Sequence, residues 1–166
     1  GSLENRSRFA LETIKAVRSA MPDSAPLFVR ISSSEFIDGG WSIEDSVQLS
    51  KWMKDAGVDL VDASAGGNSV DQVVNLKPGY QVPFADAIRN QAGIMTGAVG
   101  LIREAQQAED ILEAGHADAV FIGRELMRNP YWSLYAQAQL DGKSGNWPYQ
   151  YKPASFDYGY LGPSSI

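Results

Sequence analysis

The stretch AVFIGRELMRNP, residues 119–130, decides how the rest of the sequence is interpreted. Its apolar part ends at Gly123, Arg124 follows at once, and the residues after it have a helical pattern. In parallel α/β folds, the groups that bind ligands lie beyond the carboxyl ends of the strands. Glycine lets a backbone approach a ligand closely, and arginine offers a bidentate positive charge. A strand that ends in Gly-Arg therefore indicates a contact with an anion.

The rest of the chain alternates between short apolar runs and longer amphipathic segments. The predicted strands are residues 26–32, 59–64, 93–100 and 118–123. Each is short, nearly continuous in apolar residues and bounded by turn residues, which predicts a strand buried on both faces. The predicted helices are residues 8–21, 42–57, 84–93, 103–115 and 131–140. Ser42 is a good N-cap with Asp45 three residues on. The order αβαβαβαβα indicates repeated βα units and a parallel sheet.

Two architectures are compatible with this order. A doubly wound sheet of four or five strands fits the length, and the pattern alone slightly favours it. A (β/α)8 barrel needs roughly 250 residues, so a 166-residue chain would be part of one. The strand ends favour the barrel, because barrels often bind phosphate at the loops after their last two strands. Here those loops begin with residues 97–100 and with Gly123-Arg124, and we interpret them as two sides of a phosphate site. The alternative is a glycine that merely ends a strand and an arginine that pairs with an acid.

Arg30 lies inside an apolar strand, where a positive charge needs an anionic partner. That partner is either a ligand or Asp62 on the next predicted strand. His116 follows a glycine and precedes a strand, so we expect an exposed loop residue at the end opposite the site. We interpret the tryptophans Trp41, Trp52 and Trp132 as packing residues.

Composition narrows the classes of function. The length favours one domain, and the net charge of −6 with scattered basic residues argues against nucleic acid. The chain has no cysteine and one histidine, so no disulfide framework and no metal site are expected. No run approaches the roughly 20 apolar residues of a membrane span, and no signal peptide is visible, so we expect a cytosolic protein.

Six segments together resemble the Old Yellow Enzyme family, closest to its YqjM-like and xenobiotic-reductase-like bacterial ene-reductases. The segments are GSLENRSRF, PLFVRIS, WMKDAGVDLVDAS, PGYQVPFADAIR, TGAVG and ADAVFIGRELMRNP, in family order between Gly1 and Leu140. The resemblance implies a (β/α)8 barrel with FMN at its carboxyl end. It also implies reduction of activated C=C bonds, as in enones, with NADPH or NADH as the hydride donor.

The resemblance also implies roles for residues of this chain. Arg30 is similar to the arginine beside flavin N1 and the C2 carbonyl, where a fixed cation stabilises the reduced flavin. Val99 and Gly100 are similar to one phosphate-binding loop, and Gly123 and Arg124 to the second. Residues 1–140 are then an FMN-binding half barrel, strands five to eight, and residues 141–166 are a tail.

The family's substrate-binding histidine pair and proton-donating tyrosine lie in the first half of the barrel. No catalytic residue is therefore expected in this chain, whose tyrosines we place in the last helix and the tail. Lys152 and Pro153 occupy the region where some relatives carry an arginine for the neighbouring subunit. The expected partner is an N-terminal half-barrel polypeptide or a second copy of the chain. The alternatives are a stand-alone or dimeric half barrel that binds FMN or another phosphate without catalysis, and a purely structural domain.

Overall fold

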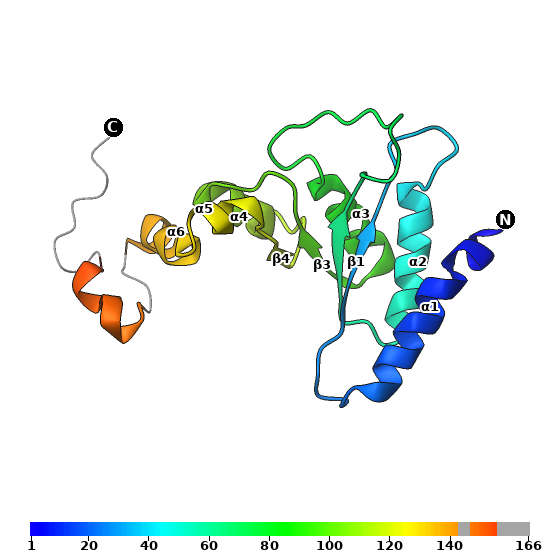
Figure 1. The fold of residues 1–166 in the computed structure, drawn as a ribbon, viewed down its shortest axis with the longest axis horizontal. Helices are drawn as coiled ribbons and strands as arrows, with labels where there is room; N and C mark the ends of the chain where they lie inside the picture. The colour runs from blue at the N-terminus through cyan, green and yellow to red at the C-terminus, as the bar shows by residue number, and fades with distance from the viewer. Residues whose placement is uncertain (143–146, 156–166) are drawn as a thin grey trace.

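The computed structural model of the chain describes residues 1–142 and 147–155. A parallel four-stranded sheet lies at its centre, with α1 and α2 side by side at one end and α6 at the other (Figure 1). The elements in chain order are α1 (Leu3–Ala20), β1 (Phe28–Ser32), α2 (Ile43–Asp55), β2 (Leu60–Ser64), α3 (Val82–Ala92), β3 (Met95–Ala98), α4 (Ala105–Glu113), β4 (Ala119–Val120), α5 (Arg124–Arg128), α6 (Trp132–Asp141) and the 3-10 helix η1 (Tyr149–Ala154).

The predicted order of strands and helices is confirmed, with two differences. Residues 124–128 form a separate short helix, α5, and the last strand is much shorter than predicted. β4 pairs only with β3, through Gly97–Ala119 and Ala98–Val120, and nothing in the described part of the chain pairs with its other side. Because an edge strand has ladder hydrogen bonds on one side only, it ends where that single pairing ends.

The sheet order decides between the two candidate architectures. The strands lie in the order β1-β2-β3-β4 and are all parallel, so each new strand is added on the same side of the sheet and the strand order never reverses. A doubly wound sheet needs such a reversal, with helices on both faces. Here the helices pack on the face that carries Val61, Ala63 and Ala98, which are fully buried. Four βα units wound in one direction are a segment of a (β/α)8 barrel, as the sequence predicts.

The opposite face of the sheet is open in this chain. One row of paired residues on it is apolar, namely Phe28, Leu60 and Met95. Phe28 and Met95 are 53% and 51% exposed, whereas Leu60 between them is buried. The prediction that every strand is buried on both faces is therefore wrong for β1, whose residues alternate between exposed and half-buried. A barrel interior fills this face with side chains from the other strands.

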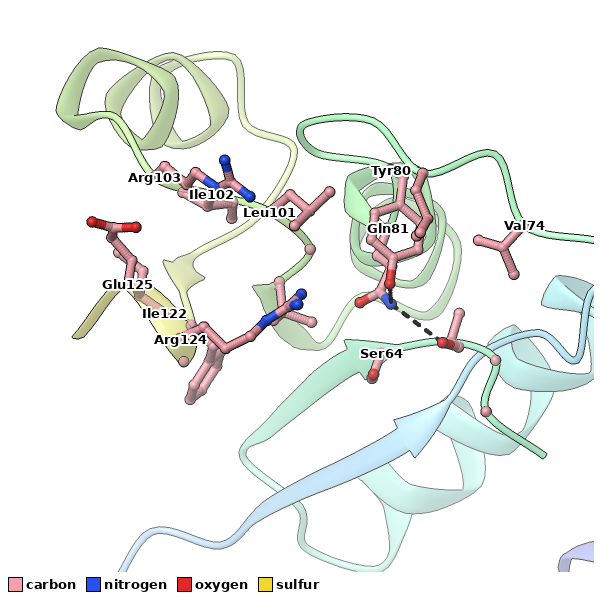
Figure 2. A pocket seen from close by; sticks show the side chains of 18 of the residues that line it. Ser64, Val74, Tyr80, Gln81, Leu101, Ile102, Arg103, Ile122, Arg124 and Glu125 are labelled. Carbon is pink, nitrogen blue, oxygen red and sulfur yellow. Dashed lines mark hydrogen bonds between the residues drawn. The ribbon is translucent and has the colours of Figure 1, made fainter. Parts of the chain in front are cut away.

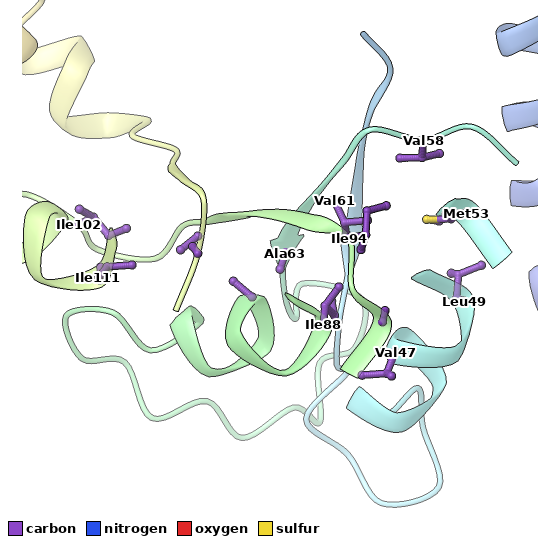
Figure 3. Packing of buried hydrophobic residues seen from close by; sticks show 14 of the residues in the cluster. Val47, Leu49, Met53, Val58, Val61, Ala63, Ile88, Ile94, Ile102 and Ile111 are labelled. Atoms are coloured by element: carbon purple, nitrogen blue, oxygen red, sulfur yellow. The ribbon is translucent and has the colours of Figure 1, made fainter. Parts of the chain in front are cut away.

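The core lies between the sheet and helices α2 and α3. Met53, Val61 and Ile88 are fully buried in it, and Figure 3 shows them among the neighbouring valines, leucines and isoleucines. Ser42 begins α2 as predicted: its hydroxyl accepts a hydrogen bond from the Asp45 N–H (3.3 Å), and the Asp45 carboxylate accepts one from the Ser42 N–H (3.4 Å). This capping box fixes where α2 starts after the loop that follows β1.

Much of the predicted tail, residues 143–146 and 156–166, lies outside the described residues. Between these gaps Trp147 is buried and its ring stacks on Tyr131 at a centroid distance of 6.0 Å. Tyr151 of η1 lies against the same Tyr131 ring. Within the described ranges, no helix combines the length and the apolar character needed to cross a membrane.

Candidate functional site

A cavity of about 530 Å³ lies at the carboxyl ends of the strands. It is formed by the segments that follow β2, β3 and β4 together with Arg30 of β1, and its size is that of a small-molecule site. The five predicted binding residues all line it, namely Arg30, Val99, Gly100, Gly123 and Arg124. Figure 2 shows Arg103, Arg124 and Glu125 on one side of the cavity, and Tyr80, Gln81 and Ser64 on the other.

The lining of the cavity is strongly cationic. Its charged residues are four arginines and one glutamate, namely Arg30, Arg103, Arg124, Arg128 and Glu125. The Glu125 carboxylate accepts hydrogen bonds from Arg128 at 2.6 and 3.2 Å, so that acid is already neutralised. Within residues 1–142 and 147–155, the guanidinium groups of Arg103 and Arg124 have no ion-pair partner. The cavity thus concentrates positive charge in a chain whose net charge is −6.

Arg30 has the protein partner that the sequence offered as one alternative. Its Nη1 lies 3.4 Å from Asp62 Oδ2, and the two residues are paired in the register of β1 and β2. The Asp62 side chain is only 9% exposed, and burial raises the pKa of its carboxyl, while the positive charge of Arg30 acts in the opposite direction. The Arg30 side chain is 56% exposed, so the ion pair leaves much of its guanidinium open to a ligand.

The loop after β3 is held by the segment that precedes α3. Gly100 has a φ of +117°, which few residues with a side chain adopt, and a Cβ atom at this position would lie 3.2 Å from the Gln81 Cβ. The Gly79 N–H donates a 2.8 Å hydrogen bond to the Gly100 carbonyl. Glycine is therefore required at position 100 by the backbone and by close packing.

The loop after β4 is positioned by an aromatic ring that lies on β3. A Cβ atom on Gly97 would lie 1.9 Å from the Phe121 ring, so the ring can occupy this place only because residue 97 is glycine. Phe121 is followed by Ile122 and then by Gly123, which precedes α5. A Cβ atom on Gly123 would meet nothing within 4 Å, so the packing of this chain does not require glycine there. The open space beside Gly123 belongs to the cavity.

Polar lining residues that the sequence analysis missed include Tyr80, Gln81 and Arg103. The placement of the tyrosines only in the last helix and the tail is wrong, since Tyr80 lies in the cavity wall. The sequence could have indicated Arg103, because it follows the glycine loop at residues 97–100 closely, much as Arg124 follows Gly123. Its backbone is fixed by the Trp132 indole N–H, which donates a 2.6 Å hydrogen bond to the Arg103 carbonyl.

The residues expected to lie away from the site do so. His116 is exposed at the amino end of β4, and its Nδ1 lies 3.0 Å from Asp86 Oδ1. The three tryptophans Trp41, Trp52 and Trp132 pack, half-buried, against the core, which confirms their interpretation as packing residues.

Comparisons with known proteins show the family and the architecture of the chain. The model of the NADH:flavin oxidoreductase / NADH oxidase family matches residues 1–143. Two solved structures share the architecture. 2-Naphthoyl-CoA reductase has a TM-score of 0.74 at 25% identity, over 86% of this chain and 22% of its own. Histamine dehydrogenase from Rhizobium sp. 4-9 has a TM-score of 0.65 at 24% identity, over 86% of this chain and 20% of its own. The chain belongs to the NADH:flavin oxidoreductase / NADH oxidase family, which confirms the Old Yellow Enzyme resemblance.

The curated relatives are more similar in sequence and much longer. NADPH dehydrogenase of Geobacillus thermodenitrificans is 52% identical over 152 residues, which cover 92% of this chain and 44% of the relative. NADPH dehydrogenase of Bacillus subtilis is 49% identical over 141 residues, which cover 85% of this chain and 41% of the relative. The chain therefore spans less than half the length of these relatives.

Proposed function

We propose that this chain is the flavin-holding part of an FMN-dependent NAD(P)H:alkene oxidoreductase, completed by a polypeptide that supplies the first four βα units. The observation that carries the proposal is the cavity at the strand ends, where four arginines and one already paired glutamate meet two glycine loops. A dianionic phosphate is the ligand that such a cavity would hold best. The family relationship indicates FMN, with NADPH or NADH as reductant.

The lining residues fit FMN in size and in chemistry. The volume of about 530 Å³ lies in the range of cofactor sites, and the space beside Gly123 is one that a side chain would partly fill. In this proposal Val99, Gly100, Gly123 and Arg124 surround the phosphate, and Arg30 faces the N1 and C2 carbonyl side of the ring. Bound FMN would supply hydride transfer from the nicotinamide to the activated C=C bond of an enone.

Arg30 would act through a fixed charge. Its ion pair with Asp62 and its place on β1 hold the guanidinium at the edge of the cavity, so it needs little reorganisation when negative charge develops nearby. The histidine pair that binds the substrate carbonyl in the family is absent from the cavity wall among the described residues, because the chain's one histidine, His116, lies at the other end of the sheet. We therefore assign no catalytic residue to this chain and expect those residues in the first half of the barrel.

The free edges and the open face of the sheet support an added half barrel as the partner. β1 and β4 each lack a neighbouring strand among the described residues, and Phe28 and Met95 present an apolar row beside them. Unpaired edges favour the addition of further strands. A second copy of this chain would offer the same edges and is the alternative partner. A cytoplasmic location is part of the same proposal.

The test compares the chain alone with the chain co-expressed with the first-half polypeptide. The complete barrel should retain FMN and oxidise NADPH in the presence of cyclohexenone, whereas the chain alone should show no turnover even when saturated with FMN. Positioning of the reactants supplies on the order of 7–11 kcal/mol of a barrier, and the chain alone lacks it. Turnover by the chain alone, with mass spectrometry showing a single polypeptide, would refute the proposal.

One alternative function has a specific observation in its favour. All the predicted anion-binding residues lie in this one chain, so a half barrel could bind FMN or another phosphate without catalysis. A complete barrel that binds FMN tightly but neither accepts hydride from NADPH nor reduces any enone would favour this alternative.

A further inference from the structure

The Tyr80 hydroxyl is a hydrogen-bond donor without an acceptor. The Gln81 Nε2 group donates to the Tyr80 oxygen at 2.6 Å and to the Ala65 carbonyl at 3.2 Å. The Ala65 carbonyl can only accept, so the amide nitrogen must face it, and the reverse orientation of the amide would bring two oxygens together. Tyr80 therefore accepts from Gln81, and its own O–H hydrogen is left for another partner.

No such partner exists within residues 1–142 and 147–155. The only hydrogen bond of the Tyr80 side chain in this part of the chain is the one from Gln81. Gln81 is 4% exposed, so the group that orients Tyr80 is itself well fixed. Tyr80 lines the cavity, and Figure 2 shows its ring extending from the loop toward the end of β2, where Ser64 lies. The free O–H thus belongs to the wall of the candidate site.

The position of Tyr80 along the cavity follows from the strand order. Its ring packs against the loop after β3, since a Cβ atom on Gly100 would lie 3.2 Å from Tyr80 Cδ1. Its hydroxyl shares the Gln81 amide with Ala65, which follows β2. The hydroxyl therefore lies between Arg30 on β1 and Arg124 after β4, at the two edges of the sheet.

We propose that the Tyr80 hydroxyl donates a hydrogen bond to an oxygen of the polyhydroxylated linker of FMN, between ring and phosphate. This inference rests on the proposed function, in which Arg30 faces the flavin ring and Arg124 the phosphate. The ribityl linker is the part of FMN that spans these two ends, and its oxygens accept hydrogen bonds. Gln81 is a positioning residue, because it occupies the Tyr80 oxygen as a donor and turns the O–H hydrogen toward the cavity.

The test uses four probes on the complete barrel: FMN, riboflavin, lumiflavin and inorganic phosphate. Riboflavin has the linker without the phosphate, lumiflavin has neither, and phosphate competes with FMN. Tyr80→Phe should weaken FMN and riboflavin alike, by roughly 2- to 12-fold, the range of one neutral hydrogen bond. Lumiflavin and phosphate should bind it as they bind the wild type. Arg124→Ala should show the complementary pattern, with FMN and phosphate weakened and riboflavin unchanged.

Two further variants separate a ligand contact from a loss of structure. Tyr149→Phe makes the same chemical change at an exposed tyrosine outside the cavity lining, and should leave all four affinities unchanged. Gln81→Met should weaken riboflavin as Tyr80→Phe does, because the freed Tyr80 O–H can then turn to the Ala65 carbonyl.

The outcomes separate this inference from the proposed function. Equal riboflavin affinity in wild type and Tyr80→Phe would overturn the linker contact while leaving FMN binding intact. A loss with lumiflavin would place Tyr80 at the ring, and a loss with phosphate would place it at the phosphate, and each overturns the linker assignment. A complete wild-type barrel that binds no flavin would overturn the proposed function, and the inference with it.

Discussion

The two partners of the Arg30–Asp62 ion pair should respond very differently to substitution. Asp62 is buried, with its Oδ1 lacking a hydrogen bond within the described residues, whereas the Arg30 side chain is 56% exposed. Replacing Arg30 by Met leaves a buried carboxylate without its cation. Replacing Asp62 by Asn removes the buried charge and leaves an arginine that water already reaches.

The expected sizes follow from these exposures. Breaking a fully buried pair costs about 3–5 kcal/mol, and an exposed pair contributes about 0–1 kcal/mol. This pair is exposed at one end only, so Arg30→Met should lower the free energy of unfolding by about 2–3 kcal/mol at neutral pH. Asp62→Asn should change it by less than about 1 kcal/mol, since the buried amide replaces a carboxylate whose Oδ1 already lacked a hydrogen bond within the described residues.

The pH dependence gives the reasoning a sharper test. Burial raises the pKa of Asp62 in the folded chain, and Arg30 opposes this, so Arg30→Met raises that pKa further. A carboxyl with a raised folded pKa destabilises the fold as the pH rises above its unfolded value of about 3.9. The loss of unfolding free energy caused by Arg30→Met should therefore be present at neutral pH. It should vanish below about pH 3.9, where Asp62 is protonated in both the folded and the unfolded state.

Urea unfolding of the chain at several pH values, followed by circular dichroism, measures these differences. Wild type, Arg30→Met and Asp62→Asn should share one slope against urea and differ in midpoint. A loss in Arg30→Met that stays constant down to pH 3 would refute the electrostatic reasoning, and so would an equal loss in Asp62→Asn at neutral pH.

Three further predictions concern local packing and charge. Gly97→Ala should displace the Phe121 ring and lower the phosphate affinity of the complete barrel several-fold without touching the ligand; unchanged affinity would contradict the packing role. Ser42→Ala should lower the melting temperature through a loss of about 1 kcal/mol, because it removes the capping box of α2, and calorimetry checks this. Arg103→Ala should weaken phosphate binding more than Arg128→Ala, since Glu125 neutralises Arg128 and the Arg103 side chain has no such partner in the described part of the chain; titration with phosphate compares the two.

Sequence patterns predicted the features that depend on residues near in the chain or on the neighbouring parallel strand. The alternation of apolar runs with amphipathic helices predicted the four βα units. Arg30 and Asp62 occupy equivalent places in successive parallel strands, so their pairing could be predicted from strand alignment alone. The glycine loops after β3 and β4 could be placed in one site because parallel strands end at the same edge of the sheet.

What the sequence could not predict depends on contacts between distant segments. Tyr80 lies in the long connection of residues 65–81, where no periodicity fixes the direction of a side chain. Its role depends on the orientation of the Gln81 amide, which is set by the Ala65 carbonyl. The requirement for glycine at position 97 comes from the Phe121 ring, which directly follows β4, and no local pattern indicates it.

The unpaired positive charges of the cavity favour anion binding at the expense of the folding stability of the free chain. Like charges gathered at one end of a sheet oppose folding, and the chain could have paired each arginine with one of its many acids. Two are paired, Arg30 with Asp62 and Arg128 with Glu125, while Arg103 and Arg124 have no acidic partner among the described residues. The core between α2, α3 and the sheet contains none of these arginines. An anion in the cavity would offset the repulsion between Arg103 and Arg124. These two arginines, which lower the folding stability of the free chain, would therefore raise that of the anion-bound chain.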